Sequence, residues 1–128
     1  MNTQIEVKAE IHPSEDPEKV VEAVKNIFPD MDLKITDNEV KGRTRNIKSL
    51  ENFKNKLGLQ AIRDSTRSLM KRRKENNKIH LLLNKQPATV DKISFSDGET
   101  PLGPIEVTIK SEKISELIDY LAPSKKQR

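Results

Sequence analysis

Cysteine is absent from this 128-residue sequence, which excludes disulfide bonds and thiolate metal sites. The first residues contain no basic segment followed by an apolar run, which would be the pattern of a secretory leader. No stretch approaches the roughly 20 apolar residues that a membrane-spanning helix needs. We therefore expect a cytoplasmic protein with no membrane segment.

Glycine and histidine are scarce. The four glycines form neither a Gly-rich phosphate loop nor a dinucleotide-binding fingerprint. The two histidines, His12 and His80, fall in different expected strands, so a shared metal site is not expected. Asp64 is the one carboxylate in a cationic helix, and pairing with a neighbouring arginine explains it better than a role as general base. The sequence therefore predicts no catalytic residue, no metal, no cofactor and no enzyme activity.

Aromatic residues make up only 3% of the sequence. All four lie beside or within apolar stripes, which predicts that they pack in the core: Phe28, Phe53, Phe95 and Tyr120. Proteins that read unpaired RNA bases rely on exposed rings for stacking. If nucleic acid binds, contacts to the backbone and shape of structured or double-stranded RNA are therefore favoured over base reading.

Charged residues are abundant, at 34%, and they are unevenly distributed. Residues 1–40 contain four Lys and ten Asp or Glu, whereas residues 41–74 contain twelve Lys or Arg and only two carboxylates. Residues 75–128 contain eight charges of each sign, so the positive excess arises in the middle of the chain. Hydrophobic residues, at 33%, suffice for one modest core, and we expect a single domain over 1–123 with a flexible basic tail over 124–128.

The first half of the chain shows clear strand and helix periods. Alternating apolar residues predict strands at 5–11 and 31–35, and a more polar strand at 39–45 follows a tight turn. Helical spacing predicts helices over 17–28, 46–57 and 59–76, with Asp16 as the N-cap of the first helix and Asn46 as the N-cap of the second. The basic middle of the chain is therefore expected to be mainly helical.

The second half predicts strands at 79–84, 88–95 and 105–109, with a loop between 97 and 104. Ser111 is the expected cap of a closing helix that Pro123 ends. The expected order of elements is β-α-β-β-α-α-β-β-β-α. This order predicts an α+β fold in which helices pack against a mainly antiparallel sheet.

Four cations are expected to share one face of the third helix: Arg63, Arg67, Lys71 and Lys74. Arg72 widens this face, opposite an apolar stripe at positions 59, 62, 69 and 70. Arg43 and Arg45, from the preceding strand, extend the patch if that strand lies alongside. Such a row can follow a phosphate backbone and gain entropy from counterion release. The alternative is a solvated helix face whose cations suit the negative end of the helix dipole.

The segment 84–89 (NKQPAT) joins several hydrogen-bonding side chains to a proline between two apolar segments. It can present Lys85 and Gln86 to a sugar-phosphate backbone. It can equally form a bulge or bend that only shapes the sheet.

Five strings in this order resemble a known family: EIHPSED at 10–16, IRDSTR at 62–67, LNKQPA at 83–88, LGPI at 102–105 and IDYLAP at 118–123. The family consists of small archaeal proteins usually described as predicted RNA-binding and sometimes as exosome-associated. The resemblance covers about residues 5–123. It implies an α+β fold similar to that of the large-subunit ribosomal protein that binds 5S rRNA, and it implies neither enzyme activity nor a cofactor.

The leading hypothesis from the sequence is a non-catalytic RNA-binding protein that contacts phosphates of structured or double-stranded RNA. The expected contacts come mainly from Arg63, Arg67, Lys71, Arg72 and Lys74. A protein complex such as RNA-processing machinery is an expected partner, and the chain is expected to be a monomer or a homodimer. The competing hypothesis is a protein-interaction or structural adaptor, with no direct role in nucleic-acid binding, that uses an acidic helix or an exposed sheet face.

Overall fold

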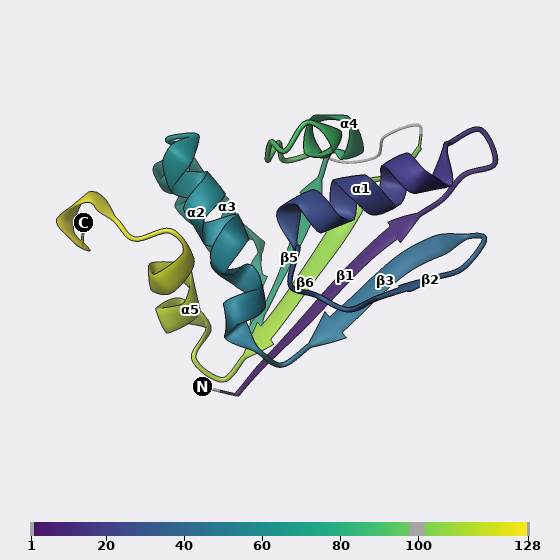
Figure 1. Ribbon diagram of the computed structural model, residues 1–128. Helices are drawn as coiled ribbons and strands as arrows, with labels where there is room; N and C mark the ends of the chain where they lie inside the picture. Colours follow the sequence, from purple (N-terminus) through teal and green to yellow (C-terminus); the bar gives the residue numbers. More distant parts are fainter. Residues whose placement is uncertain (1, 98–101, 128) are drawn as a thin grey trace.

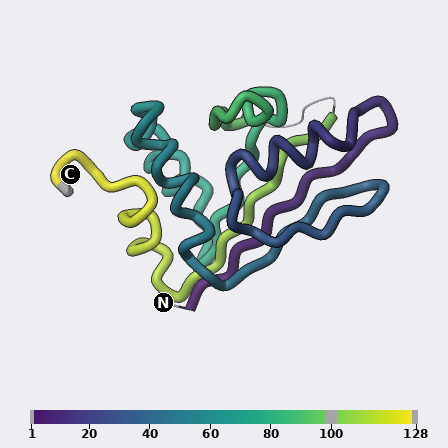
Figure 2. Tube along the Cα trace, in the orientation of Figure 1, coloured from purple at the N-terminus to yellow at the C-terminus, as the bar shows by residue number. Residues whose placement is uncertain are grey.

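The first and last strands lie side by side in the middle of the sheet. In the computed structural model, which describes residues 2–97 and 102–127, β1 (Thr3–Glu10) pairs with β6 (Ile105–Ser111) (Figure 2). On their outer sides lie β3 (Glu39–Thr44) and β5 (Lys78–Leu83). Two short strands, β2 (Leu33–Ile35) and β4 (Lys74–Glu75), form the edges. The order is β2-β3-β1-β6-β5-β4 with antiparallel pairing throughout, which confirms the predicted sheet type.

Five α-helices among the described residues pack over one face of this sheet (Figure 1). They are α1 (Pro17–Ile27), α2 (Glu51–Leu59), α3 (Arg63–Arg73), α4 (Lys85–Thr89) and α5 (Ile114–Leu121). Short 3-10 helices occur at Ile47–Leu50 and Lys125–Gln127. The caps predicted at Asp16 and Asn46 are confirmed, because each side chain accepts a hydrogen bond from the backbone N–H two residues later. No described helix has both the length and the apolar character needed to cross a membrane.

The core lies between the helices and the covered face of the sheet. Alternate residues of β1 and β6 are buried there, which places the apolar half of each strand under the helices. Phe28 and Phe53 are fully buried and stack with their ring centroids 5.9 Å apart. Phe95 meets Phe53 edge to face, and Tyr120 packs against the rim of the core. The prediction that the aromatic residues serve packing is therefore confirmed.

The opposite face of the sheet is open. Apart from Leu82, the intervening residues of these strands are polar or charged, and all are partly or fully exposed, as the alternating burial of β1, β5 and β6 shows. None of the described helices covers this face (Figure 1). We call it the open face, and the cross-strand register determines which of its side chains are neighbours.

The strand predicted over 88–95 is wrong. Residues 85–89 form α4, and only one isolated bridge, between Leu83 and Phe95, continues sheet pairing into this region. Pro87 lies in the first turn of α4, where its missing N–H has no helical partner to lose. Asp91 has a φ of 65°, which turns the chain back so that Ala88 and Ile93 are buried without forming a strand.

Three further expectations change in detail. The third helix ends at Arg73 rather than near Asn76, because Asn76 (φ 56°) forms the tight turn of the β4–β5 hairpin. Ser111 is the last residue of β6, although its hydroxyl still accepts a hydrogen bond from the N–H of Lys113 at 3.2 Å. Leu59 is 86% exposed and does not join the apolar stripe. The predicted loop between 97 and 104 falls partly outside the described residues.

Candidate nucleic-acid interface

The first two cations of α3 have their positions set by contacts within the protein. The guanidinium of Arg63 lies against Gly58, so close that a Cβ there would be 2.3 Å from its Nη2 atom. Arg67 is only 18% exposed, and its Nη1 lies 2.6 Å from Oδ1 of Asp119 and 3.2 Å from the carbonyl oxygen of Ala122. Arg67 therefore links α3 to α5, and neither arginine stands free on a helix surface as the spacing alone suggests.

The last turn of α3 carries the exposed cations. Lys71, Arg72 and Arg73 are exposed, and Lys74 continues the run as the first residue of β4. Four consecutive positive charges therefore lie where α3 passes into the edge of the sheet. Cations are favourable at this helix end because they face the negative end of the dipole. No described carboxylate forms an ion pair with any of the four, so all remain available to an anion.

A second group of cations lies on the open face of the sheet. Arg43, Arg45, Lys78 and Lys110 line a shallow hollow of about 550 Å³. The hollow lies where β3 and β6 end and where β1 and β5 begin, which is the lower end of the sheet in Figure 1. We call these four residues the basic end. The structure thus places Arg43 and Arg45 on the open face, whereas α3 packs over the covered face.

Arg43 has an internal partner in this hollow. Its Nη2 and Nε atoms donate to Oε2 of Glu6 at 2.7 and 3.1 Å, directly across the β1–β3 ladder. This hydrogen bond, helped by the charges of Lys41 and Arg43, holds the pKa of the Glu6 carboxyl below its ordinary value despite some burial. Glu6 therefore stays ionised at neutral pH and occupies the Nε–Nη2 edge of the Arg43 guanidinium.

Lys85 is deeply placed at the opposite end of the sheet. Its ammonium group contacts the carbonyl oxygens of Glu10 at 2.6 Å and Leu102 at 2.7 Å, and Oε1 of Glu15 at 2.9 Å. Both side chains of the Lys85–Glu15 pair are about nine-tenths buried. Lys85 therefore joins three of the five family strings, which meet here from distant parts of the sequence.

Gln86, next to Lys85, is exposed at a hollow of about 680 Å³ that also involves the start of α1. The surrounding side chains include Glu15, Asp16 and Lys19. The two residues predicted to make a second RNA contact are thus brought to one hollow, but Lys85 already has three oxygen partners. The contacts of Lys85 with Glu10, Glu15 and Leu102 support a role in holding these parts of the chain together.

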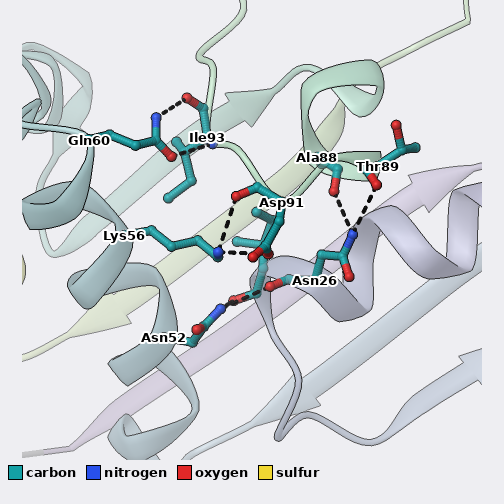
Figure 3. A network of polar contacts seen from close by, with 9 residues as sticks. Asn26, Asn52, Lys56, Gln60, Ala88, Thr89, Asp91 and Ile93 are labelled. Carbon is teal, nitrogen blue, oxygen red and sulfur yellow. Dashed lines mark hydrogen bonds and ion pairs between the residues drawn. The ribbon is translucent and has the colours of Figure 1, made fainter.

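A network of amide and ammonium groups holds the chain after α4 in place (Figure 3). Asn26 donates to the carbonyl oxygens of Ala88 and Thr89, while Lys56 reaches both the carbonyl oxygen and the carboxylate of Asp91. Gln60 exchanges two hydrogen bonds with the backbone of Ile93, at 2.9 and 2.8 Å. Side chains of α1 and α2 therefore replace the ladder hydrogen bonds that the expected strand would have supplied.

No group of three or more potential metal ligands occurs among the described residues. His12 lies 3.7 Å from a carboxylate oxygen of Glu10, and His80 lies 3.6 Å from one of Glu106 and 3.0 Å from the hydroxyl of Thr108. His12, just after β1, thus contacts the last residue of that strand, whereas His80 on β5 contacts residues of the adjacent strand β6. The arrangement offers cationic surface for anion binding and provides no metal-ligand cluster within the described part of the chain.

Two cations of the basic end, Lys78 and Lys110, were not predicted from the sequence. Their region carries equal numbers of each charge, which hides them in a count along the chain. Alternation in β5 and β6 places both on the polar side of their strands, and this signal was available. What the sequence lacks is the register that sets Lys78 opposite Lys110.

Comparisons with known proteins agree on one family. A family model described as RNA binding matches residues 4–111. A UPF0200/UPF0201 protein of Archaeoglobus fulgidus is 40% identical over 98% of this chain, but the chain spans only 39% of that relative's length. A UPF0201 protein of Sulfurisphaera tokodaii is 40% identical, with 94% of this chain and 88% of the relative covered.

Solved structures show the same fold. The crystal structure of a UPF0201 protein superposes with a TM-score of 0.85 at 38% identity and covers 98% of this chain and 97% of its own. The UPF0201 protein from Methanococcus jannaschii gives a TM-score of 0.84 at 31% identity, with coverage of 95% and 94%. The α+β architecture is therefore shared with these structures over nearly the whole chain.

Proposed function

Because the chain belongs to the archaeal UPF0201 family and matches a family model described as RNA binding, we propose that it is a non-catalytic RNA-binding protein. The observation that carries the proposal is the run of four exposed cations from Lys71 to Lys74 at the end of α3. These charges neutralise backbone phosphates and release condensed counterions, so affinity depends steeply on salt. Arg67 acts mainly by linking α3 to α5.

The proposed ligand is structured or double-stranded RNA. Phe28 and Phe53 are fully buried and Phe95 and Tyr120 are partly buried against the core, so no Phe or Tyr ring of the described residues stands fully exposed for base stacking. Exposed Lys and Arg side chains contact phosphates and the shape of the helix without reading bases. The protein is therefore expected to prefer a stem or duplex over an unstructured strand of equal length.

The test is fluorescence anisotropy with a labelled RNA hairpin, repeated across a series of KCl concentrations. Replacing residues 71–74 together by Gln is expected to weaken binding and to reduce the salt slope by up to about four. The matched control replaces four exposed lysines outside this run, Lys19, Lys25, Lys125 and Lys126, by Gln. Wild-type protein that does not bind, or a control that loses as much affinity, would contradict the proposal.

Pull-down from native extract separates RNA binding from the adaptor function. Partners that are lost after nuclease treatment support the proposal, whereas partners that survive it favour an adaptor. The same proposal includes three further properties: association with RNA-processing machinery, a cytoplasmic location, and a fold like that of the 5S-rRNA-binding ribosomal protein. Crosslinking in cells, followed by sequencing, identifies the bound RNA, and empty libraries would favour the adaptor function.

A further inference from the structure

We propose that the hollow at the basic end of the open face binds a phosphate group of the RNA backbone, as a second contact separate from the end of α3. This inference deepens the proposed function and depends on it. It assigns a binding role to Lys78 and Lys110, to which no RNA contact was attributed from the sequence. It also assigns a competing role to Glu6, the carboxylate that lines the same hollow.

The register of the sheet aligns these side chains in rows across the strands. Lys78 lies directly opposite Lys110, and Lys110 lies opposite Gln4. Thr44, the last residue of β3, pairs with Ile5, and Arg45 directly after it lines the hollow together with Gln4. Neighbouring strands are about 4.8 Å apart, so the row from Lys78 to Arg45 spans roughly 14 Å. This length accommodates a phosphodiester and its neighbouring sugars.

The charges in this row are not neutralised within the protein. Like charges directly opposite each other on a sheet are destabilising, yet Lys78 and Lys110 occupy such a pair. No described carboxylate lies in ion-pair contact with either ammonium group. Two acids come near in sequence or register without forming such a contact. Glu75 is the cross-strand neighbour of Lys78 on β4, and Glu112 accepts a hydrogen bond from Asn2. A bound phosphate would supply the missing negative charge.

The neutral side chains of the hollow suit a phosphate rather than a base. Thr108 and Gln4 line it together with the cations, and both carry groups that donate hydrogen bonds to anionic oxygens. No aromatic residue lines it, so stacking of a base is not provided for. The hollow lies on the open face of the sheet, which none of the described helices covers, so a continuous chain can pass across it.

Glu6 already occupies part of the site that a phosphate would use. Its carboxylate receives two hydrogen bonds from Arg43, and Nζ of Lys41 lies 4.0 Å from its other oxygen. Two oxygens of a phosphate can accept hydrogen bonds from the same edge of the guanidinium. RNA must therefore displace Glu6 from Arg43 or bind beside it, so removing the Glu6 charge should strengthen binding.

The experiment compares two pairs of charge-matched variants by anisotropy with the same RNA hairpin. K78Q/K110Q removes two charges from the hollow, and K19Q/K25Q removes two from α1 on the covered side. The first variant is expected to bind on the order of tenfold more weakly with a salt slope reduced by about two. E6Q is expected to bind several-fold more tightly, whereas E22Q on α1, which makes the same charge change, should match the wild type.

Equal affinities of K78Q/K110Q and K19Q/K25Q would overturn the inference, and so would equal affinities of E6Q and E22Q. If wild-type protein fails to bind, the proposed function itself fails. If binding depends on residues 71–74 but not on Lys78 and Lys110, only the second contact fails. Amide chemical shifts give an independent readout, because RNA should move the signals of Gln4, Lys78 and Lys110; unmoved signals during saturable binding would also overturn it.

Discussion

The sequence predicts that Arg67 lies on an RNA-binding surface. In the structure its guanidinium instead connects α3 to α5. Its guanidinium joins the carboxylate of Asp119 on α5 to the carbonyl oxygen of Ala122 just after that helix. Helical spacing correctly puts Arg67 on the same helix as Lys71, but spacing carries no information about what lies across from each side chain. A partly buried, hydrogen-bonded arginine contributes stability that a solvated one does not.

R67Q is expected to lower the free energy of unfolding by about 1–3 kcal/mol, because it removes two charge-assisted contacts and leaves Asp119 without this partner. R72Q, at an exposed position of the same helix, should leave stability within about 0.5 kcal/mol of the wild type. Urea denaturation followed by circular dichroism measures both. A variant R67Q that is as stable as R72Q would contradict the structural role of Arg67.

Glu6 predicts how stability responds to acid. Its folded-state pKa lies below the unfolded value because Arg43 hydrogen-bonds the carboxylate. The ion pair therefore stabilises the folded protein at pH values above the unfolded-state pKa, and this contribution is lost as the pH falls through the lowered pKa. The difference in unfolding free energy between wild type and E6Q should accordingly shrink over this acidic interval.

A carboxyl NMR titration gives the direct measurement for Glu6. R43Q removes the largest cause of the shift, so the pKa of Glu6 should rise toward its ordinary value in that variant. K8Q removes a smaller electrostatic contribution and should move the pKa less. Equal titration curves in wild type and R43Q would show that Arg43 does not hold the carboxylate in solution.

Elements with a strong period were predictable from the sequence, and elements held by side-chain contacts were not. Strand β1 and helix α1 follow directly from alternation and from the Asp16 cap. The segment after Leu83 has the same apolar content as a strand, but Lys56 on α2 donates to Asp91 and Gln60, just after α2, exchanges hydrogen bonds with Ile93, which fixes the segment in another form. Contacts between residues more than 30 positions apart leave no local pattern.

Gly58 in α2 and Gly42 in β3 allow a comparison of the same glycine-to-alanine substitution in a helix and in a strand. A Cβ at Gly58 in α2 would meet only the far end of the Arg63 side chain, which can move into solvent. A Cβ at Gly42 in β3 would lie 2.5 Å from Sδ of Met31 and 2.9 Å from Cδ2 of Leu33. Met31 is buried in the core, and Leu33 is packed against it. The same substitution should therefore have opposite effects at the two positions.

G58A is expected to raise the free energy of unfolding by up to about 1 kcal/mol, because alanine is the better helix former. G42A is expected to lower it by about 1–3 kcal/mol through overpacking. Denaturant titration of both variants measures the difference, and RNA affinity of G58A reports whether the displaced Arg63 adds a contact. The packing of Met31 and Leu33 is refuted if G42A unfolds at the wild-type midpoint.

The candidate interface was predictable only as an excess of positive charge. The sequence correctly places this excess between residues 41 and 74, and the run at the end of α3 lies within it. The basic end was missed as a unit because it combines Arg43 and Arg45 with Lys78 and Lys110, which are brought together by strand register. Register depends on which strands pair, and a single sequence with alternating strands permits several pairings.

Considered as a whole, the open face has charge of opposite sign at its two ends. Lys78 lies opposite Lys110 at one end, and Glu10 lies opposite Glu39 at the other. Lys110 is level with Gln4 and Glu39 is level with Glu10, so six residue steps along β1 separate these ends by about 20 Å. This distance exceeds the screening length of about 8 Å at physiological ionic strength, so each end acts on a nearby polyanion separately. RNA should therefore be attracted to the basic end and repelled from the acidic one.

The lack of cysteine makes this orientation measurable, because a single introduced thiol carries any label alone. N77C lies in the exposed turn before Lys78, and S14C lies at the acidic end near Glu15. With a thiol-linked photocrosslinker of about 10 Å reach, shorter than the roughly 25 Å length of β1, N77C should crosslink bound RNA strongly and S14C weakly. High salt should abolish both yields, because the attraction is electrostatic. Equal yields at low salt would show that RNA does not distinguish the two ends, and a higher yield from S14C would move the interface to the Lys85 end of the molecule.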